Sequence, residues 1–125
     1  MNNFPKSNTN HYKTFNKILD IFNFNTSSIG YHYLLEGLVL FTNINSSSIH
    51  FEFNLKNDFY KNIYYKHNIQ NINRIQWSID KTISSMIKYT PKSTLKIFFP
   101  NTNKPSSKLV ITKILDIYYK RINHS

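Results

Sequence analysis

Apolar side chains recur along most of this 125-residue chain at the three- and four-residue intervals of an α-helix. The clearest run keeps isoleucine and methionine on one helix face for about four turns, at Ile72, Ile75, Ile79, Ile83, Met86 and Ile87. Asn71 is a suitable N-cap before this run, and Thr90 ends it because a residue before proline resists the helical conformation. The pattern therefore predicts a long helix over 72–89.

The same spacing predicts further helices over 11–24, 29–43, 58–67 and from 106 or 107 onward. Ser27 or Ser28 is available as the N-cap of the second of these, and Asp58 as the N-cap of the third. Residues 49–55 alternate apolar and polar side chains, which fits a short strand but also a short helix or a turn. Taken together, the segments predict an all-α fold.

The length of the chain leaves room for one hydrophobic core. Residues 1–10 hold four Asn and one Pro, so we expect a disordered leader there and a single helical domain over 11–122. Cysteine is absent, which excludes disulfides and thiolate metal sites. No apolar stretch approaches the ~20 residues of a membrane span, and the first residues lack the apolar region of a secretory signal. We therefore expect a cytoplasmic protein without a membrane partner.

The two halves of the chain carry very different charge. Residues 1–60 hold four Lys against four acidic residues, whereas residues 61–125 hold twelve Lys or Arg against two Asp. The whole net charge of +10 therefore lies in the second half. Such a one-sided field attracts polyanions and speeds their encounter. A basic surface that serves only solubility is the alternative, and the asymmetry argues against it.

The predicted segments in the second half have the order of a helix-turn-helix. A short helix over 58–67 and a turn over 68–71 precede the long helix over 72–89. In this motif the second helix buries one face and offers the other to the major groove of double-stranded DNA. On that outward face we expect the base-reading residues, which are Asn73, Gln76, Trp77, Asp80 and Lys81.

Two members of this reading face stand out. An outward Trp77 indicates a partner surface, unless a neighbouring helix covers it inside the fold. Asp80 would meet phosphate repulsion in the groove unless it accepts a hydrogen bond from a cytosine amine or orients a neighbour. Around this face, polar and basic side chains are expected to contact phosphates: Lys61, Lys66, His67, Asn68, Arg74, Ser84, Lys88, Lys104 and Lys108.

Motifs for catalysis are missing from the sequence. The five histidines show no metal-ligand spacing, and the acidic residues form no paired motif. Only two glycines are present, so there is no glycine-rich phosphate loop. We expect a protein that is not an enzyme, with no metal, no cofactor and no small-molecule substrate.

Three stretches of the chain follow the sequence patterns of one known family. Residues 30–38, GYHYLLEGL, are similar to its G-Y-x-Y-L-R-E-A-I segment. Residues 75–83, IQWSIDKTI, keep the apolar spacing of its recognition-helix motif V-E-R-A-I-R-H-A-I, and Lys104-Pro105-Ser106-Ser107 begins a match to its C-terminal segment. The chain thus resembles the C-terminal DNA-binding effector domain of the stage-zero sporulation master response regulator of endospore-forming Firmicutes.

The resemblance implies an all-α fold of about six helices and a helix-turn-helix that reads DNA in the major groove. It also implies head-to-tail dimers on tandem sites and a regulator of transcription in a spore former, here as a stand-alone relative without a receiver domain. The family pattern has Glu, Arg, Arg and His where this chain has Gln76, Trp77, Asp80 and Lys81, so the family's target sequence does not carry over.

Two functional hypotheses follow. The first is a DNA-binding transcriptional regulator associated with the nucleoid, whose basic second half supplies salt-dependent affinity. The second is a protein-interaction module that pairs with a full-length regulator through Trp77 and the last helix and lacks specific DNA binding. A homodimer would fit the first hypothesis, and a heterodimer with a related regulator would fit the second.

Overall fold

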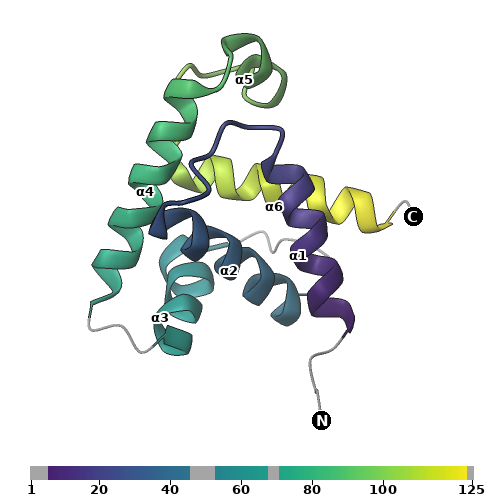
Figure 1. Ribbon diagram of the computed structural model, residues 1–125, viewed down its shortest axis with the longest axis vertical. Coiled ribbons are helices and arrows are strands. Elements are labelled where there is room, and N and C mark those ends of the chain that lie inside the picture. The colour runs from purple at the N-terminus through teal and green to yellow at the C-terminus, as the bar shows by residue number, and fades with distance from the viewer. Residues whose placement is uncertain (1–5, 46–52, 68–70, 124–125) are drawn as a thin grey trace.

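The computed structural model describes residues 6–45, 53–67 and 71–123, with side chains from residue 11 onward. These residues form six α-helices and one π-helical segment, η1, in the order α1 (Lys6–Leu19), α2 (Ile29–Ile44), η1 (Leu55–Tyr60), α3 (Lys61–His67), α4 (Ile72–Tyr89), α5 (Lys92–Phe98) and α6 (Ser107–Asn123) (Figure 1). The described part of the chain contains no strand. The prediction of an all-α fold with about six helices is confirmed.

Helix α2 lies at the centre of the arrangement, packed against α1, α3, α4 and η1. Helix α6 crosses the molecule and packs against α1 and α4. Helix α4 forms one long edge, with α5 at its C-terminal end (Figure 1). One hydrophobic core joins these elements; among its fully buried members are Phe15, Ile18, Leu34, Leu38, Phe59, Ile63, Ile79, Ile83 and Ile114.

The start of α2 and both ends of α4 lie where the sequence predicted them. The Ser28 hydroxyl accepts a hydrogen bond from the backbone N–H of Tyr31, and the Asn71 side chain accepts one from the N–H of Asn73. At the other end of α4, Thr90 has extended dihedral angles, as a residue before proline prefers. The predicted span of 72–89 is confirmed.

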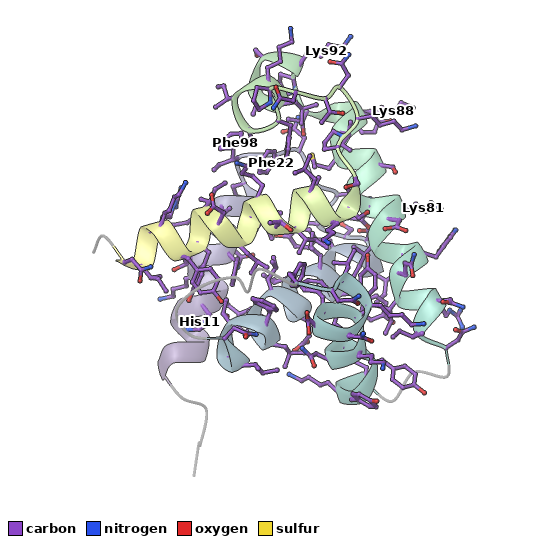
Figure 2. All side chains as sticks on the ribbon, turned by 180° about the vertical axis from the view of Figure 1, so that it is seen from behind. His11, Phe22, Lys81, Lys88, Lys92 and Phe98 are labelled. Carbon is purple, nitrogen blue, oxygen red and sulfur yellow. The ribbon has the colours of Figure 1, made fainter. Side chains whose placement is uncertain are left out.

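Helix α1 lies five residues earlier than the spacing of its apolar residues predicted. It begins at Lys6, inside the segment predicted as a leader, and ends at Leu19. Residues 6–10 contain Ser, Asn and Thr, whose low helix propensity hid this first turn. Phe22 is buried all the same, because the turn after α1 brings its ring to 5.2 Å from that of Phe98 (Figure 2).

The prediction of Asp58 as an N-cap is wrong. The residue before η1, Asn54, is the cap, and its side chain accepts from the N–H of Asn57. The Asp58 carboxylate instead accepts the backbone N–H of Asn54 at 2.7 Å, so it stabilises the cap residue from within η1. Of the segment 49–55, residues 49–52 lie outside the described residues, Phe53 is buried and Leu55 opens η1.

The contact between α2 and α4 depends on a glycine. A Cβ atom at Gly30 would lie 2.1 Å from the backbone oxygen of Ser78 and 2.1 Å from the Thr82 hydroxyl. The two helices therefore approach more closely than any other residue would allow. The Ser28 and Thr82 hydroxyls are 3.1 Å apart and add a hydrogen bond across the same crossing. This contact fixes which face of α4 points outward.

Candidate nucleic-acid interface

Three cations lie along the outward face of α4 at seven-residue intervals: Arg74, Lys81 and Lys88, here called the basic stripe. All three are exposed, because Ile75, Ile79 and the other buried positions of α4 take the opposite face. Seven residues are almost two helical turns, so successive cations stack on one line about 10.5 Å apart. Figure 2 shows Lys81 and Lys88 on the same side of α4. None of the three forms an ion pair with a described residue.

Trp77 lies on the same outward face, beside the basic stripe. Its side chain is 63% exposed, so the alternative in which a neighbouring helix of the chain covers it is wrong. The Lys81 ammonium lies 4.9 Å from the centre of the indole ring, a cation–π contact that orients both groups. Trp77 and the exposed Ile29 flank a groove of about 310 Å³ between α4 and the start of α2.

Asp80 has a partner inside the protein. The hydroxyl of Ser107, the first residue of α6, donates a hydrogen bond of 2.6 Å to the Asp80 carboxylate. This bond directs the carboxylate toward α6. Sequence reasoning missed Ser107, because the two residues are 27 positions apart and no local pattern joins them.

Two of the predicted phosphate contacts are engaged elsewhere. The Lys66 ammonium and the His67 ring lie 2.6 Å and 3.3 Å from the Glu36 carboxylate. Burial opposes the ionisation of Glu36, but its hydrogen bonds and charge interactions with Lys66 and His67 outweigh burial and lower its pKa. The Tyr12 hydroxyl donates a longer hydrogen bond of 3.3 Å to the same carboxylate. Glu36 thus joins α1, α2 and α3, a role that the sequence did not indicate.

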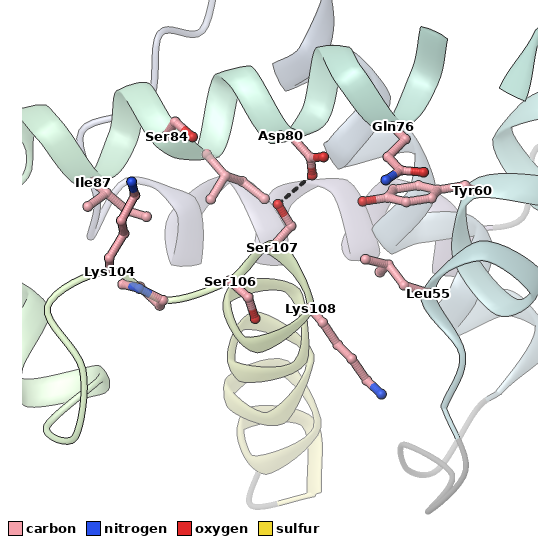
Figure 3. Close-up of a pocket in the computed structure, with 12 residues that line it drawn as sticks. Leu55, Tyr60, Gln76, Asp80, Ser84, Ile87, Lys104, Ser106, Ser107 and Lys108 are labelled. Atoms are coloured by element: carbon pink, nitrogen blue, oxygen red, sulfur yellow. Dashed lines mark hydrogen bonds between the residues drawn. The ribbon is translucent and has the colours of Figure 1, made fainter. Parts of the chain in front are cut away.

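The remaining predicted residues occupy three places. Asn73 is exposed in the first turn of α4, beside the basic stripe. Lys61 is half-buried at the start of α3, and Asn68 lies outside the described residues. The others gather around a pocket between α4 and the start of α6 (Figure 3); these are Gln76, Ser84, Lys104 and Lys108.

The described residues offer no metal site, since no three of their His, Asp or Glu side chains come together in a way that could hold an ion. Over the same residues, none of the helices is both long and apolar enough to cross a membrane.

Comparison with known proteins finds no matching family model, no matching curated protein and no matching solved structure. The resemblance to the sporulation regulator's effector domain therefore stays a prediction.

Proposed function

We propose that this chain is a DNA-binding transcriptional regulator in which α4 docks in the major groove of double-stranded DNA. The observation that carries the proposal is the basic stripe on the outward face of α4. A surface cation without an ion-pair partner remains available for a phosphate, and phosphate contacts supply most of the salt-dependent affinity of DNA-binding proteins. The net charge of +10, all in residues 61–125, adds a field that draws DNA to this side of the chain.

The shape of α4 supports the same proposal. Arg74 and Lys88 are fourteen residues apart, which sets the stripe's length at about 21 Å. The major groove is about 12 Å wide and admits one α-helix, and α4 lies at an edge of the molecule where a duplex could approach (Figure 1). The short α3 precedes α4 and packs against it, an order that fits a helix-turn-helix.

Within this proposal the residues of α4 have three roles: phosphate contact, base contact and the positioning of α4. Arg74, Lys81 and Lys88 contact phosphates, and Trp77 contacts a base or sugar with its exposed ring. The exposed Asn73 has an amide that suits base edges, whereas Gln76 lines the pocket between α4 and the start of α6, on a side that the basic stripe does not reach. Asp80 is held by Ser107, so its contribution is to position α4 against α6 rather than to read a base. By its resemblance to the sporulation regulator's effector domain, the chain would also form dimers on tandem sites and take part in sporulation. We place it in the cytoplasm, associated with the nucleoid.

Fluorescence anisotropy with a labelled mixed-sequence duplex tests the proposal at several salt concentrations. We expect the logarithm of the association constant to fall steeply with the logarithm of salt concentration. Lys81→Ala removes one stripe cation and lowers the slope by about 0.9, whereas Lys13→Ala, an exposed lysine on α1, leaves it unchanged. Absence of binding by the purified chain at low salt would refute the proposal.

A protein-interaction module that pairs with a related regulator is the second candidate. It is favoured by one observation, the exposed apolar pair Ile29 and Trp77 at 58% and 63% exposure. This candidate predicts that Trp77→Ala abolishes pairing with the regulator and leaves any DNA binding unchanged. Selection of duplexes from a random pool separates the two, because only the first candidate predicts an enriched sequence.

A further inference from the structure

A second concave surface lies beside α4, on a side that the basic stripe does not reach. It is a pocket of about 500 Å³ between α4, η1 and the segment that leads into α6 (Figure 3). None of Arg74, Lys81 and Lys88 lines it. The volume falls within the range of about 300–1,000 Å³ that is usual for small-molecule sites.

The wall from η1 contains a buried hydroxyl group without a partner. The Tyr60 side chain is 2% exposed, and its hydroxyl makes no hydrogen bond of acceptable geometry. Burial raises the pKa of Tyr60, and the charge of the nearby Asp80 carboxylate and a poorly aligned hydrogen bond to it raise the pKa further, so the group keeps its proton and remains a donor. A buried donor without a well-aligned acceptor costs free energy, part of which a ligand that supplies a better-placed acceptor would recover.

Around Tyr60 the pocket combines apolar and polar chemistry. Leu55 contributes an apolar wall, and the Gln76 amide can both donate and accept. One oxygen of Asp80 accepts from Ser107, and the carboxylate also faces the Tyr60 hydroxyl, so a ligand amino group placed between Tyr60 and Asp80 has a carboxylate to donate to. Figure 3 shows Tyr60 and Gln76 together on one side of the Asp80–Ser107 bond. A planar heterocycle suits these groups. Its ring can pack against Leu55, a ring nitrogen can accept a hydrogen bond from Tyr60, and an amino group can donate one to Asp80.

The opposite end of the pocket is cationic. Lys104 lies on the other side of the Asp80–Ser107 bond from Tyr60, close to Ile87 of α4 (Figure 3). It is exposed and forms no ion pair with a described residue. An ammonium group in this place suits a phosphate at the far end of the same ligand.

We propose that this pocket binds a nucleoside monophosphate, with the base beside Tyr60, Gln76 and Asp80 and the phosphate at Lys104. The donor and acceptor groups at one end and Lys104 at the other match the two halves of such a ligand, and Lys108, on the Leu55 side of the pocket, is a second cation in the lining (Figure 3). The site is separate from the basic stripe, so it does not depend on DNA binding.

Isothermal titration of the full chain with AMP, GMP, CMP and UMP in turn, in phosphate-free buffer, tests this site. We expect at least one of them to bind with a stoichiometry of one and a Kd below about 1 mM. Tyr60→Phe removes only the hydroxyl and weakens binding by about tenfold, while the free energy of unfolding changes little because that hydroxyl makes no well-aligned hydrogen bond within the protein. Lys104→Ala weakens binding about fivefold, and Lys13→Ala is the matched lysine control without effect.

Three results would overturn the proposal. One is that none of the four nucleotides binds at millimolar concentration. Another is that both Tyr60→Phe and Lys104→Ala leave the measured Kd unchanged, which would place the nucleotide elsewhere. The third is that inorganic phosphate alone binds as tightly as the nucleotide, which would mean that the base end contributes nothing. Lys81→Ala distinguishes the two sites, because it should weaken DNA binding and leave nucleotide binding unchanged.

Discussion

Helices α2 and α4 meet at Gly30, but they use the rest of their surfaces in opposite ways. Helix α2 contains no Lys or Arg, packs against four other elements, and has its one carboxylate, Glu36, bonded to neighbours on α1 and α3. Helix α4 buries one face and leaves a line of cations and Trp77 exposed, with no described element covering them. The difference separates stability from binding: substitutions in α2 should unfold the protein, whereas those on the outward face of α4 should change only what it binds.

The largest effect is expected where the two helices touch. In Gly30→Ala the new Cβ would lie 2.1 Å from the Ser78 carbonyl oxygen, a backbone atom that cannot rotate away. The helices must move apart, and we expect a loss of about 3 kcal/mol in the free energy of unfolding, since overpacking a well-packed contact costs about 1–3 kcal/mol or more. Urea denaturation followed by circular dichroism measures the loss.

Gly37→Ala is the matched control on the same helix. Its Cβ would meet the ring of Phe59 at 2.5 Å and the end of the Ile63 side chain at 2.8 Å, both of which are side-chain atoms. These can shift, and alanine also has a higher helix propensity than glycine by about 1 kcal/mol. We expect a loss of about 1 kcal/mol. If both glycines tolerate alanine equally, the close approach of α2 and α4 is not what holds them together.

Trp77→Ala should have the next largest effect, on binding alone. With 63% of its side chain exposed, its loss should change the free energy of unfolding by no more than about 0.5 kcal/mol. DNA affinity should fall about tenfold, because a large aromatic contact surface is removed from the interface. Anisotropy titration and urea denaturation of the same variant give the two numbers. Unchanged DNA affinity with an intact fold would favour the protein-interaction candidate.

The local features of this contrast could be predicted from the sequence, and the reasons are physical. The span of α4 follows from a long apolar face between a good N-cap, Asn71, and a residue before proline, Thr90. The exposure of Trp77 follows from the same helical period. By contrast, the first turn of α1 after Lys6 contains Ser, Asn and Thr, whose low helix propensity gives no sign of a helix start there.

The contacts between distant segments could not be predicted. Lys66 and His67 look like available cations in the sequence, because their partner Glu36 lies about 30 residues earlier on another helix. The Asp80–Ser107 bond and the burial of Tyr60 depend in the same way on how α4, η1 and α6 come together. Helical periodicity shows which face of one helix is buried, but not which residue of another helix meets it.

Glu36→Gln tests whether the contacts of α2 with α1 and α3 contribute to the free energy of unfolding. Because its partners lower the pKa of Glu36 in the folded state, its charge stabilises the fold above its ordinary pKa of 4.5, and this contribution is lost as the pH falls through the folded-state pKa. We expect the variant to be less stable by about 1 kcal/mol at pH 7, a modest value because Lys66 is half exposed to solvent. Urea denaturation between pH 7 and pH 3 should show the two proteins converging at the acidic end.

The smallest expected effect is on the salt slope of DNA binding, and it compares a lysine that is paired inside the protein with a lysine of the basic stripe. Lys66 is bonded to Glu36, whereas Lys81 contacts the ring of Trp77 and forms no ion pair with a described residue. If phosphates bind the basic stripe, Lys66→Ala should change the salt slope of DNA binding by less than about 0.2, against about 0.9 for Lys81→Ala. The two variants remove the same charge, so a net-charge effect would lower both slopes equally. Equal slopes would show that the field of the whole domain, rather than the face of α4, accounts for DNA affinity.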